Sequence, residues 1–411
     1  MGHNRLYEIG FRPFGDDGTG GAVVGNEMVF ENNLVRNVAH NGFQFIPGPA
    51  KQGTTYPYAS SDLVAGAVLI KDNIFEWACL LESDCGGLKH WAGDLGFRDH
   101  LLIGNVYRNI IGWSYSVQMQ NLIPTTWPYY NPVNRKYWRL MLGFGFGSYF
   151  DFAPGSYHFR NIAYNVGSNC YQWTSRIAES EMYFHNNLAA NCYNGFASNW
   201  DVLNGGLGTP TTQHTSTSIQ GNILAAVAAN GLIMYRDNDN QQNGLPRSFA
   251  GNFAMDYNLW SRVGYDNRSD SVYRRGVADI TYLDPSLSNG GNPTSTLAGL
   301  QAKEPLVSIH DQSVNPAFTG FNPDVWARSI LSQSQDATLT SFLTDNDIDW
   351  TAYTLSAGSP AVDRMSSSLP LMLQTVMQYW GLNPEVVGAQ MDLGPLESGI
   401  TWTARMKGPE R

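Results

Sequence analysis

The sequence has few charged residues and no long apolar run. Only 15% of its 411 residues are charged, and 35 acidic against 25 basic residues give a formal net charge of −10. Because phosphate contacts need clustered Lys and Arg, this balance argues against nucleic-acid binding. No stretch of apolar residues is long enough to span a bilayer, so the sequence predicts no membrane-spanning helix.

Cysteine is also scarce, and a leader pattern is missing. The four cysteines include no CxxC pair, which argues against a zinc site or a thioredoxin-like redox site. The first residues, MGHNRLYEIGFRPFG, lack the basic-then-apolar pattern of a signal peptide. The chain starts as if already inside its architecture, and we expect further sequence to precede Met1.

Glycine, aromatic residues and asparagine are plentiful instead. The 42 glycines and 13% aromatic residues favour many short strands joined by tight turns. A short pattern recurs in which Asn precedes an aliphatic residue and an apolar alternation. It occurs as ENNLVRN, KDNIFEW, IGNVYRN, FRNIAYN, HNNLAAN, QGNILAA and DYNLWSR, with the aligned residues Asn33, Asn73, Asn105, Asn161, Asn187, Asn222 and Asn258.

This repeat predicts a stack of coils, because short strands bury their inner faces only when neighbouring coils stack. We expect Asn to tolerate the left-handed backbone at the coil corner and to hydrogen-bond to its counterpart in the next coil. The interval from Asn161 to Asn187 is close to one coil, whereas that from Asn105 to Asn161 requires a large insertion. Cys170 and Cys192 fall at similar places in neighbouring repeats, where they are either stacked, with or without a disulfide, or buried thiols.

The asparagine pattern over about residues 26–265 resembles the right-handed parallel β-helix repeat proteins of bacteria. The segments LSAGSPAVD (355–363) and VGAQMDLGPLE (387–397) resemble the closing segment common in secreted members. The resemblance implies an all-β, single-stranded right-handed parallel β-helix with coils over residues 1–285, a long inserted loop at about 113–150, and capping coils and a tail over 286–411. SLPLMLQTVMQYWG (368–381) has apolar residues at helical spacing, which predicts one amphipathic helix against the end of the solenoid.

The resemblance also implies a secreted or cell-surface protein that binds sugar chains along one face. The predicted insertion 113–150 is rich in aromatic and basic residues, which suit sugar faces and acidic groups. A hydrophobic flap or a partner contact would have the same composition. The candidate substrate-binding residues are Trp91, Trp113, Tyr115, Trp127, Tyr130, Trp138, Tyr149, Arg108 and Arg160.

The stretch ESDCGGLKHWAGD (82–94) is the second candidate, because it concentrates acids and a lysine around two glycines. Strand alternation would put Leu88 inward and Lys89 outward. In a glycoside hydrolase one carboxylic acid protonates the leaving oxygen and another acts as nucleophile or base. The candidate catalytic residues are Asp84, Asp94, Asp151 and Lys89.

Two other functions stay open. The spacing of Glu82, Asp84 and Lys89 resembles the chondroitinase B and alginate lyase family, which implies that the two acids hold Ca²⁺, that Lys89 is the base and that Arg108 is its partner. If the protein is not a Ca²⁺-dependent lyase, we expect no cofactor. The third possibility is a non-catalytic glycan-binding or fibre protein, in which Lys89 only pairs with a neighbouring acid at a polar corner. His90 is interpreted as a surface histidine, and His158 and His185 as structural residues of the repeat strands.

A polysaccharide-processing enzyme, most simply a glycoside hydrolase, is therefore the leading prediction, with a polysaccharide or glycan as its partner. The sequence leaves the substrate, the anomeric outcome and the oligomeric state open.

Overall fold

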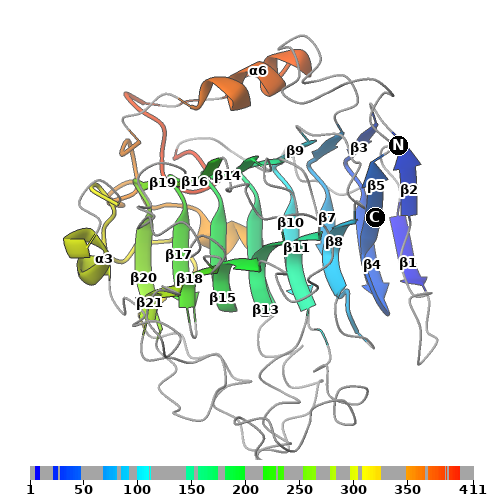
Figure 1. The fold of residues 1–411 in the computed structure, drawn as a ribbon, viewed down its shortest axis with the longest axis horizontal. Coiled ribbons are helices and arrows are strands. Elements are labelled where there is room, and N and C mark those ends of the chain that lie inside the picture. The colour runs from blue at the N-terminus through cyan, green and yellow to red at the C-terminus, as the bar shows by residue number, and fades with distance from the viewer. Residues whose placement is uncertain are drawn as a thin grey trace, which may run out of the picture.

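The computed structural model describes residues 5–9, 22–25, 28–47, 68–80, 85–91, 100–110, 112, 145–151, 156–174, 181–199, 216–227, 230–235, 253–264, 278–283, 297–303, 308–324, 349–365, 369–384, 386 and 388–398. These residues form an all-β architecture in which parallel strands stack side by side along the long axis of the molecule (Figure 1). The prediction of a parallel β solenoid is confirmed at this level.

The strands form three rows, and every pairing within a row is parallel. The first row is the sheet of β3 (Val29–Glu31), β6 (Leu69–Lys71), β9 (His100–Ile103), β12 (Ser156–Phe159), β14 (Glu181–His185), β16 (Ser216–Gln220) and β19 (Phe253–Asp256). The second row is β1 (Arg5–Ile9), β4 (Leu34–Val38), β7 (Ile74–Glu76), β10 (Val106–Ile110), β13 (Ile162–Thr174), β15 (Leu188–Asn199), β17 (Ile223–Val227) and β20 (Leu259–Val263). The third row is β2 (Ala22–Gly25), β5 (Phe43–Pro47), β8 (Cys85–Trp91), β11 (Gly145–Asp151), the second halves of β13 and β15, β18 (Asn230–Tyr235) and β21 (Ala278–Leu283).

The seven repeated asparagines form one continuous hydrogen-bonded ladder at the corner between the first and second rows. Asn105 Nδ2, for example, donates to Asn161 Oδ1 at 3.0 Å, and the Asn105 backbone N–H donates to the same oxygen at 3.0 Å. Asn161 Nδ2 also donates to the Leu102 carbonyl at 2.9 Å. These contacts confirm that the asparagines stack from coil to coil, and that Asn105 and Asn161 belong to neighbouring coils despite the long sequence between them.

The left-handed residue at this corner is not the ladder asparagine, so that part of the prediction is wrong. Positive φ angles occur instead at the residue just before it, namely Asn32, Asp72, Gly104, Arg160, Asn186, Gly221 and Tyr257. A second left-handed position recurs four residues after the ladder asparagine, at Asn37, Trp77, Asn109, Asn165, Asn191, Ala226 and Arg262. The ladder asparagines are not among the left-handed residues, and their backbone N–H groups donate along the stack to the next side chain, as that of Asn105 does to Asn161.

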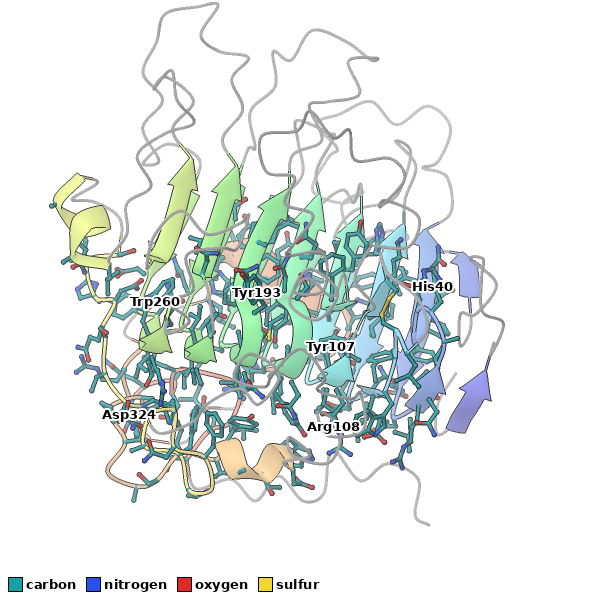
Figure 2. All side chains as sticks on the ribbon, turned by 90° about the horizontal axis from the view of Figure 1, so that it is seen from below. His40, Tyr107, Arg108, Tyr193, Trp260 and Asp324 are labelled. Atoms are coloured by element: carbon teal, nitrogen blue, oxygen red, sulfur yellow. A yellow bond between two sulfur atoms is a disulfide. The ribbon has the colours of Figure 1, made fainter. Side chains whose placement is uncertain are left out.

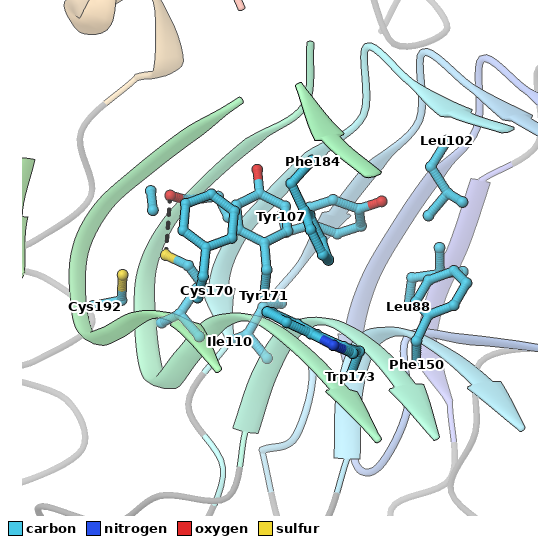
Figure 3. Packing of buried hydrophobic residues seen from close by; sticks show 14 of the residues in the cluster. Leu88, Leu102, Tyr107, Ile110, Phe150, Cys170, Tyr171, Trp173, Phe184 and Cys192 are labelled. Atoms are coloured by element: carbon cyan, nitrogen blue, oxygen red, sulfur yellow. Dashed lines mark hydrogen bonds between the residues drawn. The ribbon is translucent and has the colours of Figure 1, made fainter. Parts of the chain in front are cut away.

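Aromatic and aliphatic side chains fill the interior. Tyr107, Tyr171, Trp173 and Phe184 are fully buried and pack with Phe150 (Figure 3). Tyr171 stacks on Phe196 of the next coil, with ring centroids 5.0 Å apart. Because each buried side chain of this size contributes about 1.5–3 kcal/mol, the stacked interior is the main source of stability.

The C-terminal end of the solenoid is closed by residues 297–303 and 308–312. Leu297 of α3 (Leu297–Lys303) joins the interior cluster, and the Ser308 N–H donates to the Met255 carbonyl at 2.6 Å. Gln312 bridges in parallel to Leu259, and Asp311 takes the next place on the ladder after Asn258. This stretch therefore adds a partial coil.

The predicted helix forms, but the prediction that it packs against the end of the solenoid is wrong. It is α6 (Leu371–Tyr379), which lies along the flank above the strands in Figure 1. Leu373, Val376 and Met377 belong to a second apolar cluster with outer side chains of many coils and with the short η4 helix (Trp350–Tyr353). The end of the stack is already covered by residues 297–303 and 308–312, whereas the flank offers a long apolar stripe.

The predicted insertion is shorter than 113–150, because residues 145–150 belong to strand β11. Tyr149 is thus a strand residue, and residues 113–144 lie outside the described ranges. The alternative of buried thiols at Cys170 and Cys192 is confirmed, because both are buried and neither forms a disulfide, and Cys170 Sγ donates to the Ala163 carbonyl at 3.2 Å (Figure 3). A disulfide that the sequence did not predict joins Cys79 and Cys85.

Candidate functional site

Strands β8 and β11 bring four of the candidate residues together from two distant segments. In the parallel register, Lys89 lies opposite Tyr149, and Trp91 lies opposite Asp151. Neighbouring strands are about 4.8 Å apart, so these backbone positions are close in space. The side chains of Trp91 and Asp151 are outside the described part of the structure.

Lys89 lies on the outer side of the third row, as predicted. Its neighbours Leu88 and His90 are fully buried in the interior, so alternation turns Lys89 outward. Its ammonium nitrogen lies 4.8 Å from the centroid of the Tyr149 ring, a cation–π contact of about 0.5–2 kcal/mol. Lys89 is nevertheless only 9% exposed, so this part of the outer face is shielded from solvent.

The interpretation of His90 as a surface residue is wrong. Inside the solenoid, the His90 ring stacks on the Phe150 ring with the ring centroids 5.0 Å apart, and it meets the Phe45 ring with the centroids 4.4 Å apart. Burial and the neighbouring His100 and His158 hold the pKa of His90 well below its ordinary value, so the ring is neutral at pH 7. His158 is also interior, and burial lowers its pKa to about 3.

Many of the sequence candidates fall outside the described residues. These are Glu82, Asp84, Asp94, Trp113, Tyr115, Trp127, Tyr130 and Trp138. Glu82 and Asp84 are between the two cysteines of the disulfide in the sequence. Among the described residues, no group of three or more His, Cys, Asp or Glu side chains is arranged to hold a metal ion. Within the described part of the chain, none of the helices has the length and hydropathy of a membrane span.

Arg108 is on a different row of strands from Lys89. Figure 2 shows Tyr107 and Arg108, consecutive on β10, with Tyr107 toward the interior and Arg108 away from it. Arg108 pairs with the buried Glu76 and donates to Tyr164 Oη at 3.2 Å. Glu76 also lies 3.3 Å from Arg36 Nε, so one carboxylate ties three neighbouring strands together.

Arg160 is at the corner between the first and second rows, where it is buried. It forms an ion pair with Glu397, which fastens the C-terminal segment to the flank. Nearby, Asn186 Nδ2 donates to the Asp392 carbonyl at 2.7 Å, and the Gly394 N–H donates to the Gly221 carbonyl at 2.7 Å. The described contacts of Arg160 therefore join two parts of the chain, and the structure does not bring it together with Lys89.

Gln172 is a polar residue of this outer row that the sequence reasoning missed. It lies opposite Tyr149 in the register of β11 and β13, between the interior residues Tyr171 and Trp173. The outer row therefore runs Gln44, Lys89, Tyr149 and Gln172 across four neighbouring strands. The only sequence signal for Gln172 is that a polar residue alternates with aromatic ones, a pattern that every half-buried strand displays.

Comparison of the chain with protein-family models, with curated proteins and with solved structures finds no match. The chemistry of the site must therefore be judged from its own groups. Outer-face residues of β8, β11 and β13 supply an ammonium group, an amide and a phenol ring in one row, with an aspartate position at the end of β11. The described side chains of this row are buried, because Lys89, Tyr149 and Gln172 are 9%, 7% and 1% exposed.

Proposed function

We propose that this chain is a secreted polysaccharide-processing enzyme, a glycoside hydrolase whose site lies at the ends of β8 and β11. The observation that supports it is the register that sets Lys89 and Trp91 beside Tyr149 and Asp151. A polysaccharide is an extended chain, and stacked coils in general present extended surfaces along their length.

The β8–β11 register supports one choice among the candidate carboxylates. Cys85 and Trp91 are the two ends of β8, roughly 20 Å apart at about 3.3 Å per residue. Asp151 is in register with Trp91, whereas Asp84 precedes Cys85 in the sequence. Paired glycosidase carboxylates are about 5 to 9.5 Å apart. We therefore infer that Asp151 works with Asp94, which follows β8, rather than with Asp84.

Two finer features belong to the same proposal. The coils wind as a right-handed β-helix, the hand that parallel crossover connections almost always adopt. Secretion is supported by the Cys79–Cys85 disulfide, because disulfides persist mainly in oxidising compartments outside the cytosol.

The test is incubation of the full chain with a panel of neutral and acidic polysaccharides. A hydrolase releases new reducing ends without ultraviolet absorbance from an unsaturated uronide. Absorbance of that kind, lost on addition of a chelator and in Lys89→Ala, would instead establish a lyase that uses Lys89 as its base. No turnover of any polymer would leave a binding or structural protein and would refute the enzyme proposal.

A further inference from the structure

Three histidines meet inside the solenoid, on the inner side of the strands that carry the proposed site. The rings of His90 on β8 and His100 on β9 have centroids 5.2 Å apart. The Phe150 ring on β11 lies 5.0 Å from the His90 ring and 4.7 Å from the ring of His158 on β12. His90, His100 and His158 therefore form one histidine cluster that connects four strands of consecutive coils.

The hydrogen bonds of the histidine cluster suit neutral rings. Both ring nitrogens of His90 are buried and have no hydrogen-bond partner among the described residues. His100 Nδ1 accepts a backbone N–H at 3.1 Å, so this nitrogen carries no proton. Ser156 Oγ donates to Met182 Sδ at 3.4 Å, so His158 Nε2 donates to Ser156 Oγ at 3.1 Å and His158 Nδ1 carries no proton. A further proton on any of these rings would place a charge inside the core.

The described groups around the histidine cluster offer that charge no partner. β5 and β14 contribute the apolar rings of Phe45 and Phe184. β13 contributes Tyr171, whose ring centroid lies 6.2 Å from that of His158 and whose hydroxyl donates to two backbone carbonyls. Among the described residues, no carboxylate acts on the pKa of His90 or of His158.

Burial and mutual repulsion oppose protonation while the coils stay closed. Burial, followed by the neighbouring His100 and His158, holds the pKa of His90 well below its ordinary value, and burial lowers that of His158 to about 3. An imidazolium at His90 would stack on the Phe150 ring, but one cation–π contact offsets only part of the cost of burying an unpaired ion. Once exposed to water, the same rings take up protons at about pH 6.5, so acid favours an open form.

His90 and Phe150 are also the central register pair of the proposed site. They lie opposite each other on β8 and β11, and their rings stack with an interplanar angle of 5°. Their neighbours on these two strands are the titratable Lys89 and Asp151 and the aromatic Tyr149 and Trp91. Because Lys89 lies on the outer side of its strand, it does not belong to the interior cluster. Any separation of β8 from β11 at the central pair also separates the residues on either side of it.

We propose that the histidine cluster is an acid-sensitive switch, in which proton uptake opens the coils of β8, β9, β11 and β12 and takes apart the β8–β11 register. The opening depends on the cluster alone, whereas its effect on catalysis rests on the proposed function. His90 and His158 together take up as many as two protons on opening. The open fraction therefore grows by up to about 100-fold per pH unit well below pH 6.5, and it returns to its former value on neutralisation.

The test is hydrogen exchange of the full chain, followed by mass spectrometry at pH 7.5, 6.5, 5.5 and 4.5 and corrected for the intrinsic exchange rate at each pH. From pH 5.5 to 4.5, exchange in 85–91, 100–110, 145–151 and 156–159 is expected to become about 50-fold to 100-fold faster. The internal reference is β20, which is packed by Trp260 and contains no histidine. Its exchange should change by less than about 10-fold, because the opening is local.

His90→Phe tests the cluster directly, because it removes one titrating ring and keeps an aromatic ring beside Phe45 and Phe150. The acceleration per pH unit should fall to about 10-fold, since one proton fewer is taken up. A purely structural effect would change the exchange rate at every pH without changing this slope. His90→Leu is the second variant if His90→Phe does not fold. His310→Gln, at a half-exposed histidine, is the matched control and should keep the slope of the wild type.

Equal acceleration in β20 and in the cluster strands, or an unchanged slope in a folded His90 variant, would overturn the switch. If the chain cleaves a polysaccharide, turnover should be lost reversibly over the same pH range, and His90→Phe should remain active at lower pH than the wild type. Local opening in a chain that cleaves no polymer would retain the switch and refute only the enzyme. Turnover without local opening would refute only the switch.

Discussion

At the scale of single residues, the end of the asparagine ladder shows why an acid replaces asparagine there. Asp311 Oδ1 accepts from the Asn258 N–H at 2.7 Å, while Oδ2 accepts from Trp260 Nε1 at 3.0 Å. Both side-chain atoms must be acceptors, and only a carboxyl group satisfies both. Burial raises the pKa of Asp311 to about 7, partly offset by these hydrogen bonds.

Asp311→Asn is expected to destabilise the fold in a pH-dependent way. Its Nδ2 would face Trp260 Nε1, a donor against a donor, at a cost of about 1–3 kcal/mol. In the wild type the folded pKa is raised, so the contribution of Asp311 is full below pH 3.8 and is lost as pH rises through about 7. Urea unfolding of both proteins at pH 5 and pH 8 should therefore show a larger deficit at pH 5. An equal deficit at both pH values would contradict the raised pKa.

Residue patterns predicted the ladder but not every role within it. Asparagine at seven repeated positions is a sequence signal, and its coil-to-coil bonding follows from amide chemistry. The left-handed corner positions are occupied by residues as different as Asp72, Arg160 and Tyr257, so composition gives no guide to them. The pairing of Cys79 with Cys85 was likewise missed, because it depends on how the chain turns between β7 and β8.

At the scale of elements, close approach of neighbouring strands requires glycine at one corner of the third row. A Cβ atom added at Gly147 would lie 2.4 Å from the Cys170 carbonyl oxygen. One at Gly87 would lie 2.9 Å from the Gly147 carbonyl oxygen, and one at Gly42 would lie 2.3 Å from that of Gly87. The obstacle in each case is backbone of the next strand, which cannot rotate away.

Gly147→Ala is therefore expected to lower the free energy of unfolding by about 1–3 kcal/mol or more, because it forces β11 away from β13. Gly358→Ala is the matched control, since an added Cβ there meets nothing within 4 Å, and its effect should stay within about 0.5 kcal/mol. Thermal unfolding of both variants gives the comparison. Equal midpoints for the two variants would show that the corner is looser than the structure indicates.

Elements were predicted better than their packing. The helical spacing of 368–381 identified α6, but its partner could not be inferred, because the apolar flank exists only after the coils have stacked. The aromatic segment before Asp151 was assigned to a loop, yet its last residues pair with β8 and β13. Register across distant strands, on which the candidate site depends, has no local sequence signal.

At the scale of the whole molecule, several histidines are buried as neutral rings. His90 and His158 lie in the interior of the solenoid, and His185 is also fully buried. Burial lowers the pKa of His158 and of His185 to about 3, and holds that of His90 well below its ordinary value. Since the folded pKa values are depressed, this stability is full above about pH 6.5 and is lost as pH falls.

Acidification from pH 7.5 to 5.5 is therefore expected to weaken the fold. Each uncompensated imidazole contributes about 1.4 kcal/mol per pH unit. Among the described residues, Asp311 and Asp392 have pKa values raised by burial, and these two groups oppose the three histidines. Urea unfolding across this range should show falling stability, with a shallower slope in His158→Phe. Constant or rising stability on acidification would contradict a neutral histidine interior.

We propose that the register of β8 and β11 places Asp151 in a catalytic site. The most direct measurement is the rate at which Asp151→Asn releases reducing ends from a polysaccharide that the wild type cleaves, beside the control Glu31→Gln, whose partly exposed carboxylate is on the first row. We expect a loss of at least about 100-fold in Asp151→Asn, the order of a general acid–base contribution, with Glu31→Gln unchanged. Full activity of a folded Asp151→Asn protein would show that Asp151 is not catalytic.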